Sequence, residues 1–201
     1  DKIQNNTYNA TENMLCYNLS KNELNAKYVD IFLDVLSLYS YAPELKSEQI
    51  KLDYIKKSAI LSLKPEQIDE NCEVVIEAID RAMFFLQTRC GIRSMQEINY
   101  SLMVVLIAIV FIEKEYFANR DIHNLLEGWY WAALFSGEYD KDQNTTFISN
   151  LKNMLKTIRK KEKIDWIKSI KENVFSMTNF SDKEFLLMEK TAEDRYQKKI
   201  F

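Results

Sequence analysis

Apolar residues recur every three to four positions along most of the chain, the spacing that places side chains on one face of an α-helix. The clearest case lies between Pro65 and Gly91, where proline occupies the first helical turn and glycine follows the last. Its apolar stripe comprises Ile68, Cys72, Val75, Ile76, Ile79, Met83, Leu86 and Cys90. The same spacing predicts helices over 21–41, 47–63, 95–117, 119–135 and 145–161, a short helix around Trp166 and a last helix from Ser181.

Capping signals and turn residues support a purely helical fold. The S-x-x-E pattern of a capping box occurs at Ser20/Glu23, Ser94/Glu97 and Ser181/Glu184. The chain has only 3 Gly and 2 Pro, which is too few for the tight turns of a strand-rich domain. We therefore predict an all-α fold.

The run Leu102–Ile112 is apolar throughout, so its helix is expected to be buried on all sides. It is shorter than the ~20 residues that a membrane-spanning helix needs, and no membrane association is predicted. We expect one domain over residues 1–201, an irregular bundle of about seven to eight helices around this central apolar helix, with an irregular lead-in over 1–20. Because the chain begins at Asp1 without Met, we expect a fragment of a longer protein.

Composition narrows the class of protein further. Hydrophobic residues make up 47 %, charged residues 28 %, and the net charge is −3, which is typical of a globular domain. The 3 Cys lack CxxC spacing and no secretory signal is visible, so we expect a reduced, cytoplasmic setting.

Residues with the chemistry of an active site are scarce. His123 is the only histidine, which excludes an HNH nuclease and any metal site with two imidazoles, and we interpret it as a surface or capping residue. Asp30 and Asp34 lie one helical turn apart, but without a third ligand we interpret them as a solvated face. No catalytic residue, metal ligand set or cofactor is predicted in this chain.

One group of cations has the spacing of a binding surface. These residues fall on one face of the helix predicted over 145–161 and just after it: Lys152, Lys156, Arg159, Lys160 and Lys163. Such a face can follow the phosphates of DNA. Against this interpretation, Glu162 and Asp165 interrupt the run, and solvated lysine-rich faces are common in chains of this composition.

The stretch EGWYWAALFSGEYD, from Glu127 to Asp140, is the densest aromatic segment. Two interpretations are open: a packed corner between helices, or a ligand cage. In the packed interpretation Trp129, Ala132, Ala133 and Phe135 face the core, while Trp131 and Tyr139 close the corner.

The order of these segments resembles the C-terminal helical part of the ParB-like restriction proteins typified by GmrS. In that family a helix ends at a Gly-Ile or Gly-Val step, and a Pro-Tyr step opens a long apolar helix. A tryptophan-rich signature follows. The matching residues are Gly91, Ile92, Tyr100, the apolar run, Trp129, Tyr130, Trp131, Phe135, Ser136, Gly137 and Tyr139. The departures from the family pattern are Asn99 for proline, Glu138 for arginine and Asn150 near a usual Asp.

The resemblance implies a function for the parent protein rather than for this segment. The family carries an N-terminal ParB-like nucleotide-hydrolysing domain with a DGQQR motif and often an HNH-type nuclease domain or partner, and it restricts modified or foreign DNA. This chain has neither motif. It would be a non-catalytic module that couples the nucleotide-hydrolysing domain to DNA or nuclease, and the nucleoside triphosphate and divalent metal would belong to the parent.

Two other classes of function stay open from the residues alone. One is a stand-alone helical scaffold that binds another protein, and the other is an enzyme with an unfamiliar carboxylate site.

Overall fold

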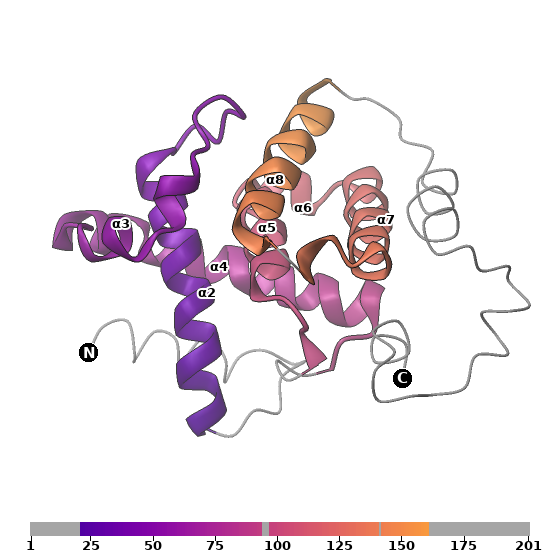
Figure 1. The fold of residues 1–201 in the computed structure, drawn as a ribbon, viewed down its shortest axis with the longest axis horizontal. Coiled ribbons are helices and arrows are strands. Elements are labelled where there is room, and N and C mark those ends of the chain that lie inside the picture. The colour runs from indigo at the N-terminus through magenta and orange to yellow at the C-terminus, as the bar shows by residue number, and fades with distance from the viewer. Residues whose placement is uncertain (1–20, 94–96, 141, 161–201) are drawn as a thin grey trace, which may run out of the picture.

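The computed structural model describes residues 21–93, 97–140 and 142–160, and every regular element in those ranges is helical (Figure 1). The all-α prediction is therefore confirmed for the described part of the chain. The predicted lead-in over 1–20 and the helices around Trp166 and from Ser181 lie outside these residues. The elements are α2 (Lys21–Tyr41), the 3-10 helix η1 (Leu52–Ile55), α3 (Lys57–Leu61), α4 (Pro65–Cys90), α5 (Ser101–Phe111), α6 (Lys114–Phe117), α7 (Arg120–Ser136), the 3-10 helix η3 (Glu138–Asp140) and α8 (Gln143–Lys160).

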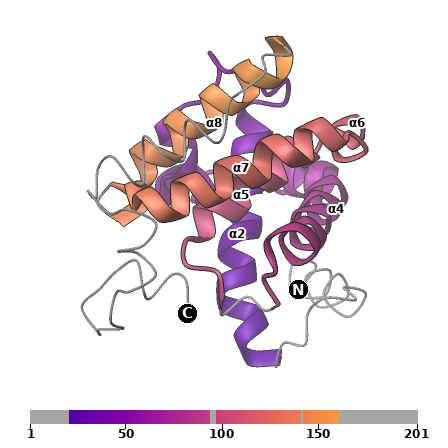
Figure 2. The same cartoon turned by 90° about the vertical axis from the view of Figure 1, so that its right-hand side faces the viewer.

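Helix α5 is buried along its whole length. All residues from Leu102 to Phe111 are buried, and α5 contacts α2, α4, α6 and α8. The helix needs no polar face because each of its sides packs against a neighbour. Figure 2 shows α7 and α8 crossing in front of α5 and α2.

Helix α4 begins and ends where the sequence predicts. The side chain of Gln67 accepts a hydrogen bond from the Lys64 backbone N–H (3.0 Å) and so satisfies one donor ahead of the first turn. At the other end Gly91 has φ 70°, a left-handed conformation that glycine adopts without a Cβ clash. Helix α7 also begins as predicted, because the Asn119 side chain accepts from the Asp121 backbone N–H (2.9 Å).

The predicted helix over 47–63 is wrong. The chain turns after α2 and then forms only η1 and α3, with extended backbone at Lys51 and Lys56. Ile50 and Ile55 are both buried, but five residues on a straight helix would place them about 140° apart. Breaking the helix between them allows both side chains to reach the core.

The predicted helix over 95–117 is shorter than expected. It begins at Ser101 and ends at Phe111, and Glu113 has extended backbone before the short α6. The Arg81 guanidinium donates to the Phe111 carbonyl oxygen (2.8 Å), one of the acceptors that a helix end leaves open. The helix therefore ends where the apolar run ends and where an arginine of α4 meets it.

In the part of the chain that the structure describes, no helix is long and apolar enough to cross a membrane.

Candidate functional site

Helix α8 has one buried face and one face toward solvent. The buried residues are Phe147, Ile148, Leu151, Met154 and Leu155. This face packs against α5, η1 and η3, elements that come from three different parts of the chain. The apolar face thereby holds α8 in a fixed orientation, and four of the predicted cations, Lys152, Lys156, Arg159 and Lys160, lie on the remainder of the helix.

The predicted cations differ in their surroundings. Lys156, Arg159 and Lys160 are exposed, Lys152 is half-buried, and Lys163 lies outside the described residues. Lys152 and Lys156 form no hydrogen bond or ion pair with another described residue. Because an unpaired ammonium group needs no partner removed before it binds an anion, these two side chains are the best placed of the set.

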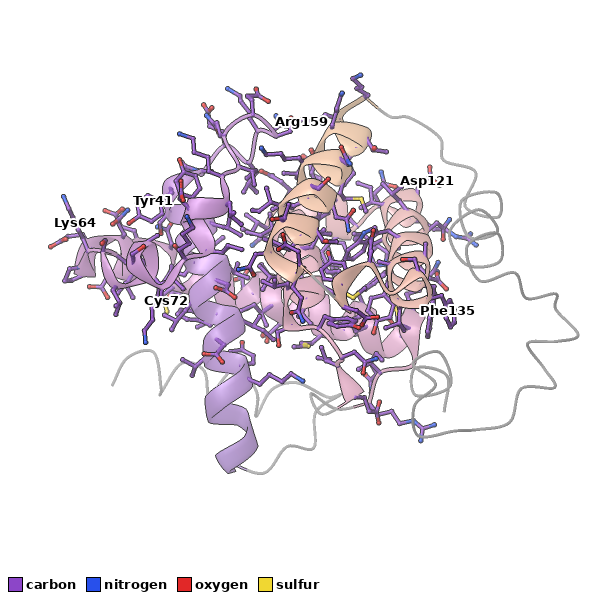
Figure 3. The ribbon with its side chains drawn as sticks, in the orientation of Figure 1. Tyr41, Lys64, Cys72, Asp121, Phe135 and Arg159 are labelled. Atoms are coloured by element: carbon purple, nitrogen blue, oxygen red, sulfur yellow. The ribbon has the colours of Figure 1, made fainter. Side chains whose placement is uncertain are left out.

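Arg159 is engaged by a loop distant in sequence. Its Nη2 donates to the backbone carbonyl oxygen of Glu44 (2.7 Å), a residue in the loop between α2 and η1. The Glu44 carboxylate pairs with Lys46 (2.6 Å) and accepts from Gln49 (3.0 Å). The hydrogen bond from Lys46 is the main cause that lowers the pKa of Glu44. Figure 3 shows Arg159 at the outer end of α8, on the side of this loop.

The aromatic stretch of α7 is partly core and partly surface. Trp129 and Tyr130 are buried, whereas Trp131 and Phe135 are half-buried. The rings of Trp131 and Phe135 stack at 5.7 Å, and the ring of Tyr130 meets Trp131 edge-on at 5.4 Å. The prediction that Phe135 faces the core is therefore wrong, because Phe135 is half-buried and stacks on Trp131, whereas the other predicted core residues Trp129, Ala132 and Ala133 are buried. Figure 3 shows Phe135 near the C-terminal end of α7.

Tyr139 and Gly137 form the corner that follows α7. Gly137 has φ 68° and ends the helix, and Tyr139 is fully buried. The Tyr139 ring lies 5.6 Å from the Tyr100 ring, and its hydroxyl accepts from the Asn150 side chain (3.4 Å). The corner is thus closed from two sides, by the start of α5 and by α8.

A ligand cage needs polar groups that are open to a ligand, but the four polar residues near the aromatic rings are all hydrogen-bonded within the protein. Glu127 accepts from Arg89 Nε of α4 (2.8 Å), and the Ser136 hydroxyl donates to the Ala133 carbonyl oxygen (3.2 Å). The Glu138 carboxylate accepts from the Asn150 side chain (2.7 Å), and the Asp140 carboxylate accepts from the Tyr100 hydroxyl. This arrangement favours the packed corner over the ligand cage.

His123 joins α7 to the end of α6. Its Nε2 donates to the Phe117 carbonyl oxygen (2.6 Å), so it satisfies an acceptor at a helix end. The imidazole lies 5.2 to 5.5 Å from the rings of Phe85, Phe111 and Phe117. The side chain is half-buried and fills a structural position.

The carboxyl groups of Asp34 and Asp80 are poorly solvated. Asp34 was expected on a solvated face but is half-buried, and loss of solvent together with the nearby Asp30 raises its pKa from 3.8 to about 7. Burial also raises the pKa of Asp80 to about 7. Asp80 Oδ1 and the hydroxyl of Tyr28 are both buried without a hydrogen-bond partner among the described residues. Within the same residues, no three His, Cys, Asp or Glu side chains are grouped as metal ligands.

Comparison with known proteins identifies no relative of the chain. No protein-family model, curated protein or solved structure matches the chain. The resemblance to the GmrS-type proteins thus depends on the residues quoted for it, and function must be argued from the surface of the molecule.

Proposed function

We propose that this chain is the non-catalytic helical domain of a GmrS-type phage-defence protein that restricts modified DNA. In this proposal it couples a ParB-like nucleotide-hydrolysing domain of the same parent chain to DNA or to an HNH-type nuclease. The nucleoside triphosphate and divalent metal belong to the parent protein. One observation carries the proposal: Lys152 and Lys156 are without ion-pair partners among the described residues, on a helix whose opposite face is buried.

The physical basis is electrostatic attraction to phosphates. Lys152, Lys156 and Lys160 follow one another at four-residue intervals, which corresponds to about 6 Å of helix axis per step. A nucleic acid is a polymer with a phosphate every few ångström, so a line of cations engages several of its charges together. Each neutralised phosphate releases counterions, and the affinity therefore falls steeply as salt rises.

Binding of a fluorescein-labelled DNA duplex, followed by anisotropy over a series of salt concentrations, tests the proposal. We expect the wild-type chain to bind, and Lys152→Glu with Lys156→Glu to abolish binding at the lowest salt. Lys64→Glu is the matched control for one charge reversal, because Lys64 is exposed and lies at the left edge of the view in Figure 3, away from Arg159 at the end of α8. Absence of wild-type binding at low salt, or equal losses in the α8 variants and the control, contradicts the DNA role.

A protein-interaction scaffold is the second candidate function. It is favoured by the half-buried, stacked pair Trp131 and Phe135 on α7, since aromatic residues with one exposed side are frequent anchors of protein interfaces. Sedimentation of the wild-type chain over a range of concentrations tests this candidate. Self-association that is lost in Trp131→Ser, in a chain without DNA affinity, would favour the scaffold.

A further inference from the structure

The loop between α2 and η1 carries the one described non-glycine residue with a positive φ. Leu45 has φ 48°, a left-handed conformation that a residue with a Cβ rarely adopts, and its side chain is buried. Strained positions of this kind persist only where the surrounding structure holds them, and they concentrate at functional sites. The conformation of this loop is therefore imposed by its contacts.

Three kinds of contact fix the loop, and one of them joins it to the end of α8. The Leu45 side chain is in the core, and its backbone N–H donates to the Ala42 carbonyl oxygen (3.0 Å). The Gln49 backbone N–H closes a second turn onto the Lys46 carbonyl oxygen (2.9 Å). Arg159 of α8 then donates to the Glu44 carbonyl oxygen (2.7 Å), which joins the loop to the helix.

The loop that Arg159 binds carries a further cation, Lys46. Lys46 begins the second turn, two residues after Glu44, and its only described ion pair is with Glu44 (2.6 Å). Both side chains of this pair are about half exposed, at 45 % and 57 %. Exposed ion pairs contribute little to stability, so an incoming phosphate can take Lys46 from Glu44 at small cost.

We propose that residues 43–49 form the second half of the DNA-contact surface, with Lys46 binding the phosphodiester backbone. Arg159 is a positioning residue in this arrangement: it holds the loop through the Glu44 carbonyl and keeps Lys46 near the C-terminal end of α8. The Glu44 carboxylate competes with DNA for Lys46. This inference rests on the proposed function, because it names further residues of the same surface.

The choice of partner follows from the layout of the charges. The cations occupy two elements, the helix α8 and a loop that lies more than a hundred residues earlier in the sequence, as the 115-residue separation of Arg159 and Glu44 shows. A single phosphate ion would contact one of them, whereas a polymer of phosphates spans both. Glu44 and Glu48 lie among these cations and lower the affinity for anions, which sets the expectation of a moderate, salt-sensitive contact.

A double-mutant cycle tests the inference: the binding of the labelled DNA duplex is measured for the wild-type chain, for each single variant and for the double variant. We expect Lys46→Gln to weaken binding several-fold. The fall of log K with log salt should also become less steep, by about one unit of slope. Arg159→Gln is expected to weaken binding at least as much, and the double variant no more than Arg159→Gln alone. Lys46→Gln and Lys156→Gln should instead act independently, so that their fold-losses multiply.

A gain in affinity provides the second arm of the test, because a destabilised loop would not produce it. Glu44→Gln keeps the backbone carbonyl that Arg159 binds and removes the acid that competes for Lys46, so binding should tighten about two-fold. Glu66→Gln, an exposed acid at the start of α4, is the control and should leave binding unchanged.

The outcomes separate this inference from the proposed function. If Lys156→Gln weakens binding while Lys46→Gln and Glu44→Gln do not change it, the loop is not part of the surface and the DNA role stands. If the losses in Lys46→Gln and Arg159→Gln multiply, Arg159 contacts phosphate directly and the positioning role is refuted. If the wild-type chain does not bind DNA, or binds it regardless of Lys156, the proposed function itself fails.

Discussion

Replacement of Asp80 by asparagine should stabilise the protein at neutral and alkaline pH. The carboxyl group loses solvent on folding and its Oδ1 has no hydrogen-bond partner among the described residues, so burial raises its pKa from 3.8 to about 7. The nearby Arg81 opposes the rise and Glu77 adds to it. Above the folded-state pKa the protein must hold a poorly solvated charge, which the unfolded chain exposes to water.

The sign and size of the effect follow from the two pKa values. Between about pH 4 and pH 7 the folded carboxyl binds a proton that the unfolded chain has released, so its contribution to stability is present at low pH and is lost as pH rises. A tenfold change in proton affinity is worth about 1.4 kcal/mol, which gives an upper bound of about 4 kcal/mol. Because the carboxyl keeps part of its solvent, we expect roughly 1–2 kcal/mol in practice.

Urea unfolding of the wild-type chain and Asp80→Asn at several pH values measures this difference. The variant should be more stable by roughly 1–2 kcal/mol at about pH 8 and no more stable at about pH 4. Asp53→Asn is the control of opposite sign, because the hydrogen bond from Lys56 lowers the pKa of Asp53 and its contribution is lost as pH falls. A difference between Asp80→Asn and wild type that does not depend on pH, or a loss of stability at pH 8, would refute the assignment.

Two further predictions concern α7 and the cysteines. Trp129→Ala should lower the free energy of unfolding by about 3–5 kcal/mol, and Trp131→Ala by roughly half as much because its ring is only half-buried; equal losses in urea unfolding would contradict the assigned burial. Burial raises the pKa of the Cys90 thiol to about 12, and Cys72 is fully buried. In a Cys16→Ser variant, a thiol reagent should therefore label the native protein only as fast as the protein unfolds. Fast labelling of the native chain by a thiol assay would show that these side chains are accessible.

The elements that can be predicted from the sequence are those whose capping residues and apolar stripe indicate the same start and end. Helix α4 has proline at its start, glycine after its end and one apolar stripe between them, and each feature indicates the same bounds. The segment 47–63 lacks that agreement. Its two buried residues, Ile50 and Ile55, would not share one face of a straight helix, and their packing against the core decides the backbone.

The surface was predictable only in part. Helical periodicity is enough to find the face of α8 that bears Lys152 and Lys156. It cannot reveal that Arg159 is bonded to the Glu44 carbonyl, since that contact joins residues 115 positions apart. The positive φ of Leu45 was equally invisible, because no glycine or asparagine marks the position.

The parent gene offers the most direct test of the central claim, that this chain is the helical module of a GmrS-type restriction protein. The measurement is its sequence on both sides of the segment Asp1–Phe201. The account predicts a ParB-like domain with a DGQQR motif encoded ahead of this segment in the same reading frame. A reading frame that encodes no such motif would contradict the account and leave an interaction scaffold as the better explanation.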